Sequence, residues 1–352
     1  MTWLIVIALG LAHGIADGSA GMQLGVLART LSVREVGSLV LVYNMLAFGS
    51  QPLVGLCFDR LGRPRVAAVG GIALHCAALL ASTHNPSLGV TLAGLGSAAF
   101  HVGGGAIASS TTEGKTVGPG LFAGPGVIGL ALGGALAVSG HSNIWPFLLP
   151  LAVCGALLIA LPIPRMATDE AYAEPLIEGH DVVMLVLLTG IALRSAVWTT
   201  FQFVFAGRYD LLLAMACAAA VGKIVGGVLA DRVGWRRWAL GALLISVPLL
   251  MAGQQSLLLL LPGVALLQSA TPICLAATAR LLPRYPATAA GLVLGLAVAI
   301  GGIPAMIGMN ALLAIPGVIA GATLVAALAL WWVLPRQEPA VPRPSIPAAS
   351  SP

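Results

Sequence analysis

The fold is decided by the stretch Gly55-Leu-Cys-Phe-Asp59-Arg60-Leu-Gly62-Arg63-Pro-Arg65. It returns 172 residues later as Gly227-Val-Leu-Ala-Asp231-Arg232-Val-Gly234-Trp-Arg236-Arg237. Each copy lies between two long apolar stretches, which is typical of a tight, basic loop that joins two membrane helices. Because the copies are about half a chain apart, we predict a duplicated, polytopic membrane protein.

Composition excludes an ordinary soluble protein. The sequence is 59% hydrophobic and 8% charged, and its mean hydropathy is +1.00, whereas soluble domains carry about 25% charged residues. The first apolar segment starts at residue 2 without a basic leader or cleavage site, so we expect a retained helix. Five cysteines stand singly in apolar segments, without the paired spacing of a zinc site or disulfide framework, and we interpret them as packing residues: Cys57, Cys76, Cys154, Cys217 and Cys274.

Twelve apolar windows of about the 20 residues that a spanning helix needs fit between the turn signals. A polar stretch, 164–181, divides the chain into two pseudo-symmetric six-helix halves, 1–163 and 182–334, and we expect it to be a cytoplasmic linker. The tail 335–352 is rich in Pro, Ser and Ala and is expected to be disordered. We therefore predict an all-α fold with helices at 2–27, 36–58, 65–83, 88–110, 119–139, 144–163, 182–206, 211–230, 238–253, 257–279, 287–309 and 314–334.

Lysine and arginine are distributed unevenly between alternate loops. With the N-terminus inside, twelve fall in inner loops and the tail, against three (Arg29, Arg34 and Arg208) in outer loops. This bias predicts a multi-pass protein of the plasma (inner) membrane with both termini in the cytoplasm. The net charge of +5 follows from this topology, so it gives no reason to expect nucleic acid as a partner.

The repeated loop resembles the signature loop of the major facilitator superfamily of secondary transporters. The resemblance covers the whole chain, because twelve helices, two halves and a central polar loop all fit it. It implies that Asp59 and Asp231 each meet the N-terminal end of a neighbouring helix, where exposed N–H groups favour a carboxylate. The alternative is that both loops are solvated turns kept basic by topology. The other signature positions are Gly55, Arg60, Gly62 and Arg63 in the first loop and Gly227, Arg232, Gly234 and Arg236 in the second.

A narrower resemblance is to the fosmidomycin-resistance branch of drug efflux proteins. The chain departs from that branch after His101, where Val102-Gly103-Gly104 stands in place of Pro-Glu-Gly, so an acidic residue expected on the fourth helix is missing. The resemblance implies Asn44 and Gln51 as contributors to a substrate site. It is carried by Ala12-His13 with Asp17, Tyr43-Asn44, Gln51-Pro52-Leu-Val-Gly55, Phe100-His101, Leu193-Arg194-Ser195, and Gly291-Leu-Val-Leu-Gly295-Leu-Ala with Gly301-Gly302.

Three charged side chains lie well inside predicted helices: Asp17, Arg194 and Lys223. A charge at bilayer mid-depth costs at least about 2.5 kcal/mol, so such side chains usually face a cavity or a partner. Asp17 and Arg194 lie near the centres of the first and seventh helices, which hold equivalent positions in the two halves. In the superfamily that the chain resembles, both of these helices line the central cavity, and the resemblance therefore implies a midplane contact between Asp17 and Arg194. The alternative is a structural ion pair that only holds the halves together.

His13 and Asp17 are one helical turn apart and project from one face of the first helix, where a carboxylate can hold an imidazole. We predict a proton-coupling group of Asp17, His13 and His101; the alternative is that the histidines are packing residues. His75 is expected to be structural. No histidine has metal-ligand spacing to another, so no metal site is predicted.

Lys223 lies eight residues before Asp231, about 12 Å along the eighth helix at 1.5 Å per residue. It either snorkels toward the inner interface or faces the cavity between the halves. In the second case Asp17, Arg194 and Lys223 give the cavity a net positive charge, which favours an anionic or zwitterionic solute. We assign substrate binding to Arg194 and Lys223, together with the Asn44 and Gln51 that the resemblance implies.

Glycines predict close packing of helices. Gly14, Gly18, Gly21 and Gly25 form a stripe on the first helix, and the fifth helix is crowded with glycines around Pro125. Small residues let helices approach closely in lipid. The run on the fifth helix resembles the Gly-Pro motif of antiporters in the superfamily, and glycines of the eleventh helix are its counterpart in the second half.

We expect a proton-coupled exporter of a small anionic or zwitterionic solute that works by alternating access. An importer of the same fold is the closest competitor, and a membrane sensor or assembly protein that no longer transports is the alternative from another class. No Gly-Lys-Ser/Thr phosphate loop and no catalytic triad on soluble structure is present, so neither an enzyme nor a cofactor is predicted. The expected partners are the solute, protons and the lipid bilayer, and we expect a monomer.

Overall fold

The computed structural model describes residues 1–163 and 180–336. Within these residues the chain is helical and has no strand. Eleven described helices are long and apolar enough to cross a membrane, and a twelfth apolar helix, α7 (Trp145–Ala160), is shorter. The predicted all-α, twelve-helix fold is therefore confirmed. The predicted linker 164–181, apart from its last two residues, and most of the predicted tail 335–352 lie outside the described residues.

The helices of the first half follow the predicted spans closely. The second span is one continuous rod with a π-helical turn, η1, at its centre. The bounds are α1 (Thr2–Thr30), α2 (Val33–Asn44), η1 (Met45–Gly49), α3 (Gln51–Leu61), α4 (Pro64–Ser82), α5 (Pro86–Thr111), α6 (Val117–Val138) and α7.

The second half repeats this plan, with a second π-helical turn, η2, in the eleventh span. Every predicted boundary in both halves lies within about three residues of the observed one, because turn residues mark the ends of the apolar windows. The bounds are α8 (His180–Val204), α9 (Tyr209–Val233), α10 (Trp235–Gly253), α11 (Leu257–Gln268), α12 (Thr271–Leu281), α13 (Pro286–Ala290), η2 (Gly291–Leu296), α14 (Ala297–Met306), α15 (Asn310–Leu313) and α16 (Pro316–Val333).

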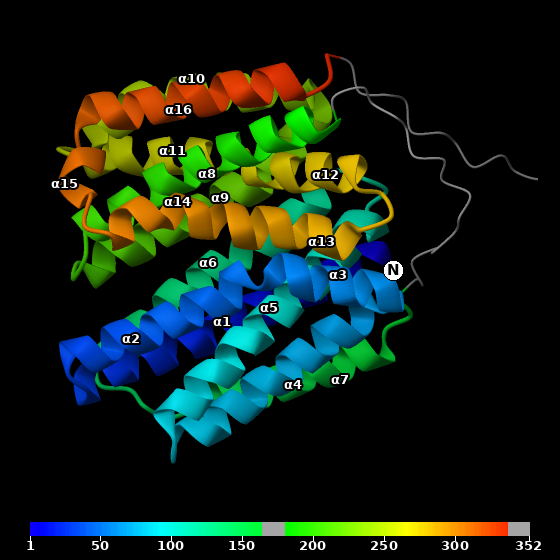
Figure 1. The fold of residues 1–352 in the computed structure, drawn as a ribbon, viewed down its shortest axis with the longest axis vertical. Coiled ribbons are helices and arrows are strands. Elements are labelled where there is room, and N and C mark those ends of the chain that lie inside the picture. Colours follow the sequence, from blue (N-terminus) through cyan, green and yellow to red (C-terminus); the bar gives the residue numbers. More distant parts are fainter. Residues whose placement is uncertain (164–179, 337–352) are drawn as a thin grey trace, which may run out of the picture.

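The two halves form separate groups of helices that lie side by side. In Figure 1, α1–α7 occupy the lower part of the molecule and α8–α16 the upper part. The N-terminus lies at the end where α3 finishes and α13 begins. We call this the basic end, because it carries the arginine-rich turns 59–65 and 231–237.

Two glycines make the turns at the basic end. Gly62 ends α3 in the left-handed conformation, with φ 62°, and Gly234 ends α9 with φ 100°. Residues with a side chain rarely adopt such φ angles, whereas glycine adopts them readily because it has no Cβ. Pro64 then takes the first position of α4, where its missing N–H is not needed.

Glycines pack α1 directly on α6. A Cβ on Gly129 would overlap the carbonyl oxygen of Gly14, and a Cβ on Gly133 would overlap that of Gly18. The glycine stripe of the first helix and the glycines of the fifth thus serve one interface, in which the two backbones touch. Dispersion between close backbones favours such pairing in lipid, where apolar burial gives no preference.

The two halves are in contact along two seams. In each seam a glycine of one half packs on a backbone carbonyl of the other half. In the first seam, between α6 and α9, a Cβ on Gly120 would lie 2.5 Å from the carbonyl oxygen of Lys223. In the second, between η2 and α3, a Cβ on Gly291 would lie 2.6 Å from that of Gln51. Gln51 and Lys223 are 172 residues apart, the offset of the repeated loop, so the duplication is preserved in the packing.

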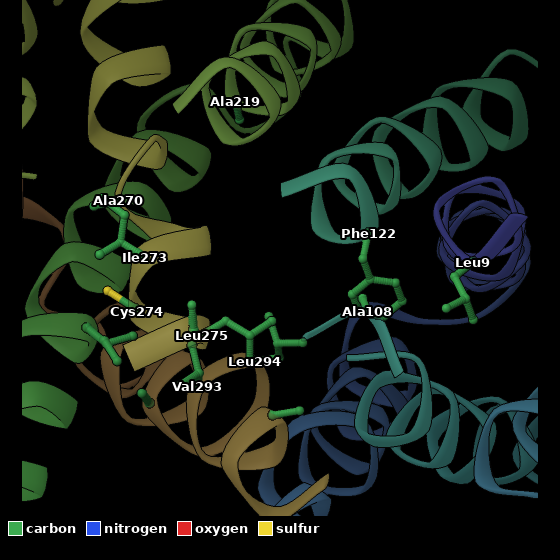
Figure 2. Packing of buried hydrophobic residues seen from close by; sticks show 14 of the residues in the cluster. Leu9, Ala108, Phe122, Ala219, Ala270, Ile273, Cys274, Leu275, Val293 and Leu294 are labelled. Atoms are coloured by element: carbon green, nitrogen blue, oxygen red, sulfur yellow. The ribbon is translucent and has the colours of Figure 1, made fainter. Parts of the chain in front are cut away.

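Apolar side chains of both halves pack together behind these seams. Figure 2 shows Leu275 of α12 and Leu294 of η2 pointing toward Ala108 of α5 and Phe122 of α6. Leu275, Ala108 and Phe122 are at most 1% exposed. A Cβ on Gly105 of α5 would lie 3.4 Å from Leu294 Cδ1, so glycine lets this leucine reach α5. These side chains form an apolar plug between the halves.

Candidate functional site

Three ionisable side chains converge in the first half. His13 and Asp17 of α1 are 3.1 Å apart, measured from Nε2 to Oδ2. His101 of α5 places its Nε2 2.9 Å from His13 Nε2 and 3.9 Å from Asp17 Oδ2. The linear spacing of the histidines predicted no metal-ligand group, yet the fold brings one donor atom of each residue within 4.8 Å of the others. We call these residues the His–Asp cluster.

Backbone carbonyls orient both imidazoles. His13 Nδ1 lies 2.8 Å from the carbonyl oxygen of Phe122, and His101 Nδ1 lies 2.7 Å from that of Ser97. A carbonyl oxygen only accepts hydrogen bonds, so we assign the ring proton of each histidine to Nδ1. Both Nε2 atoms then carry lone pairs, and those lone pairs face each other and the Asp17 carboxylate.

The Gly-Pro run of α6 makes room for this arrangement. Pro125 has no N–H, so the carbonyl of Leu121 loses its usual helical donor and faces Gly10 of α1. At Gly126 the place of a side chain is taken by the imidazole of His13. The motif that the sequence assigned to packing therefore also positions His13 against the Phe122 carbonyl.

Three potential acceptor atoms of the cluster face one another. A proton on His13 Nε2 would lie between two acceptors, His101 Nε2 at 2.9 Å and Asp17 Oδ2 at 3.1 Å. Without a cation, three lone-pair atoms would face one another in a buried site, which is unfavourable. The side chains of His13, His101 and Asp17 are 4%, 6% and 13% exposed, so the carboxylate provides the more accessible edge.

Arg194 of α8 does not meet Asp17. Its Nη1 donates to Gln268 Oε1 of α11 at 2.9 Å, and no carboxylate among residues 1–163 and 180–336 forms an ion pair with it. The expected midplane contact is therefore wrong for this conformation, because the two histidines hold Asp17 within its own half. Arg194 is 3% exposed, and its Nε has no partner in the described part of the chain.

Lys223 of α9 reaches across the first seam. Its Nζ donates to the carbonyl oxygen of Ala123 on α6 at 3.3 Å. The snorkelling alternative is therefore wrong for this conformation, because the ammonium group points to the opposite half and not along the helix to the basic end. Lys223 thus lies in the seam one turn before Gly227.

The two polar residues implied on the second span differ in accessibility. Asn44 is half-buried and donates to its own helix at the Val40 carbonyl, 2.7 Å away. Gln51 is 0% exposed and donates to the Ala47 carbonyl at 2.6 Å. Gly295 of η2 packs directly on Gln51, so this side chain is covered in the present conformation.

The first signature carboxylate caps a helix of the other half. Asp59 Oδ1 accepts the N–H of Ala287 at 2.9 Å, and its Oδ2 accepts the N–H and hydroxyl of Thr288, both at 2.7 Å. These donors are the first free amides of α13, where a negative charge also complements the helix dipole. Arg60 and Arg63 beside it are exposed.

The second signature carboxylate makes the reciprocal contact. Asp231 accepts the N–H of Thr116 at 2.8 Å, the Thr116 hydroxyl at 2.7 Å and the N–H of Val117 at 3.0 Å, all at the start of α6. Trp235 Nε1 adds a longer bond at 3.3 Å. Each half therefore caps a helix of the other at the basic end.

Several residues that build the site were not found from the sequence. The Ser97 hydroxyl lies 3.1 Å from His101 Nδ1, the Gln268 amide oxygen holds Arg194, and the Phe122 carbonyl holds His13. Ser97 precedes His101 by one helical turn and Gln268 is an amide in an apolar span, so both carried a readable signal. The Phe122 carbonyl carried none, because backbone groups are the same at every position.

His75 contacts Ser19 Oγ at 3.2 Å and is fully buried.

Packing explains why the fourth predicted helix, which is α5, has Gly103 where the fosmidomycin-resistance branch has an acidic residue. A Cβ on Gly103 would lie 2.5 Å from both the amide nitrogen of Ala68 and the carbonyl oxygen of Pro64, on α4. α5 and α4 are thus in backbone contact, with no space for a glutamate at this position. The carboxylate of the cluster comes from α1 instead.

Solved transporters share this arrangement of helices. The chain aligns with a variant of the Escherichia coli fucose:proton symporter FucP at a TM-score of 0.70 and 13% identity, over 94% of this chain and 96% of that one. The chain has the major facilitator fold. FucP in the outward conformation aligns at 0.67 and 14% identity, covering 94% and 96%. The human organic anion transporter MFSD10 (TETRAN) aligns at 0.67 and 15%, covering 93% and 98%. No family model and no curated protein matches the sequence.

Proposed function

We propose that this chain is a secondary active transporter that couples movement of a small anionic or zwitterionic solute to protons by alternating access. The observation that carries the proposal is the His–Asp cluster. Its two imidazoles are oriented so that one proton on His13 Nε2 would face two acceptors, and the Asp17 carboxylate is 13% exposed. We assign the proton-coupling role to Asp17, His13 and His101.

We relate this conformation to one state of the proposed transport cycle, the state in which the basic end is closed. The basic end is closed by the Asp59 and Asp231 caps and by the apolar plug. With this end assigned to the cytoplasm on the arginine bias, we propose that the protein is here in a state that is closed toward the inside. His101 lies one turn from Gly105, which contacts Leu294 of the apolar plug. We propose that the plug separates the cluster from the cytoplasm, so that the cluster exchanges protons with the outside in this state.

Arg194 supports the choice of solute charge. A guanidinium that is 3% exposed and has no carboxylate partner in the described residues leaves a buried charge uncompensated. Buried charges are stable only when paired, so an anionic group of the solute is a suitable partner. We assign solute contacts to Arg194, with Asn44 and Lys223 as further candidates.

Export is the direction that we propose first, because the resemblance of the sequence segments is to efflux proteins of the fosmidomycin-resistance branch. Uptake is the second candidate, and it is favoured by the structural similarity to a fucose:proton symporter. We further propose a monomer in the plasma membrane, acting without a cofactor or enzymatic step.

Reconstituted proteoliposomes test the proposal. The solute panel consists of small carboxylates and phosphonates, and flux is measured under a pH gradient of either sign and under none. If the chain is an antiporter, the solute should move in the direction opposite to that in which protons flow. If it is a symporter, the solute and the protons should move in the same direction. A flux that is the same under all three conditions would contradict proton coupling. No flux of any panel member, with well-folded protein, would favour the sensor or assembly alternative.

A further inference from the structure

We propose that the His–Asp cluster is also a binding site for a divalent transition-metal ion of the Ni²⁺ or Co²⁺ type. This inference goes beyond the proposed function, because it concerns a second cation at the same three donor atoms. Imidazole nitrogen and carboxylate oxygen are ligands that suit such ions.

The orientation of the histidines is the first support. Each ring donates its Nδ1–H to a backbone carbonyl, of Phe122 for His13 and of Ser97 for His101. Metal-ligating histidines show this pattern, because the outer hydrogen bond fixes the ring and directs the Nε2 lone pair at the metal. No movement of either ring is needed to present both lone pairs.

The distances between the donors are the second support. Around a metal with bonds of about 2.1 Å, neighbouring ligands at right angles lie about 3.0 Å apart and opposite ligands about 4.2 Å apart. The observed separations are 2.9 Å, 3.1 Å and 3.9 Å, with His13 Nε2 in the middle position. This is close to the spacing of three ligands in one plane of an octahedral or square site. At the tetrahedral angles that Zn²⁺ prefers, all three separations would be about 3.3 Å, whereas here two are shorter and one is longer.

Charge and access also fit. Asp17 supplies one negative charge, and no Lys or Arg of the described residues forms an ion pair with it. The Asp17 side chain is 13% exposed, which leaves coordination positions for water or for an oxygen of an anionic solute. A bound ion would take the place of the proton shared by the same three atoms.

The test uses the full chain purified with an affinity tag that contains no histidine. Equilibrium dialysis with Ni²⁺ is expected to show one saturable ion per chain, and Mg²⁺ at the same concentration is expected to show none. His101→Ala and Asp17→Asn should each weaken Ni²⁺ binding at least about tenfold, the usual loss when a metal site is damaged. His141→Ala, which removes an exposed histidine of the loop between α6 and α7, is the matched control and should bind as the parent does.

Co²⁺ provides a readout that does not depend on the variants. Its visible absorption distinguishes six-coordinate from tetrahedral ions, and weak bands of the six-coordinate kind are expected. Absence of saturable Ni²⁺ binding by the parent chain would overturn the inference. Unchanged affinity in Asp17→Asn would do so too. Because binding is measured without a pH gradient, and proton-driven flux can be measured with a chelator present, failure of this inference is distinguishable from failure of the proposed function.

Discussion

Asp59 and Thr288 belong to opposite halves of the molecule, yet the Asp59 carboxylate accepts both the N–H and the hydroxyl of Thr288, each at 2.7 Å. Asp231 repeats the contact with Thr116 in the other direction. Both contacts join helix ends of different halves, so separation of the halves at the basic end would break them. They are therefore suited to bias the equilibrium between two conformations, without touching the residues assigned to solute or proton.

Asp59→Asn should open the basic end more often. An amide side chain loses the charge that complements the free amides of α13 and accepts fewer hydrogen bonds, at a cost of about 1 kcal/mol. A change of this size shifts a two-state ratio about fivefold. Spin-label distances between the halves should report the shift, and transport should fall while solute affinity stays within about twofold.

Asp210→Asn is the matched control for Asp59→Asn. Asp210 is an exposed carboxylate at the other end of the bundle, paired with Arg208 at 3.6 Å. Its loss should change neither the distance distribution nor the flux. If Asp59→Asn gives the parent's distances and flux, the signature loop serves topology alone.

Asp17→Asn should abolish accumulation driven by a pH gradient while leaving counterflow exchange of solute intact. The amide cannot gain or lose a proton in the relevant range, but it preserves the shape of the site beside His13. Both modes are measured in the same proteoliposome preparation, again with Asp210→Asn as control. Full pH-driven transport by Asp17→Asn would show that another group carries the proton.

Arg194→Lys should weaken solute binding at least about tenfold, because lysine is a point charge that cannot present the planar fork of donors. Gln268→Ala should weaken binding by a smaller factor, since it removes the 2.9 Å bond that orients the guanidinium. Titration of the purified protein with the transported solute measures both. Arg208→Lys, an exposed arginine outside the site, is the control, and equal affinity of all three variants would remove Arg194 from the solute site.

Gly133→Ala should lower the melting temperature by a few degrees, whereas Gly134→Ala should not. At Gly133 the new methyl group would overlap the carbonyl oxygen of Gly18, and overpacking of this kind costs about 1–3 kcal/mol. At Gly134 the nearest atom, the carbonyl oxygen of Gly21, is 3.9 Å away. The neighbouring position makes this a matched pair, and equal melting temperatures would refute backbone contact between α1 and α6.

A cysteine at position 63 should be labelled only from the cytoplasm, and one at position 141 only from the outside. The positions lie in turns at opposite ends of the bundle, and arginine-rich turns are retained on the inner side. A membrane-impermeant maleimide applied to intact cells and to inverted vesicles measures this in a cysteine-free background. Labelling of Arg63→Cys in intact cells would reverse the assigned orientation.

Most of the fold could be predicted from the sequence because lipid imposes it locally. Each span must satisfy its own backbone hydrogen bonds and needs about 20 apolar residues, so turn residues such as Gly62 and Gly234 mark the ends. The 172-residue repeat indicated the two halves. The contact of His13 with Asp17 was also predictable, because one helical turn separates them.

The remaining parts of the site were decided by which helices touch. His101 joins His13 because Gly126 vacates the space beside the imidazole, and Asp17 misses Arg194 because each is held by partners of its own half. Gln51 is covered in this conformation because Gly295 of η2 packs directly on it. Sequence spacing fixes neighbours one turn apart on a helix, but contacts between helices depend on crossing points set by small residues and backbone groups. Those crossing points, and with them the distances from His101 to His13 and Asp17, were determined by the tertiary structure alone.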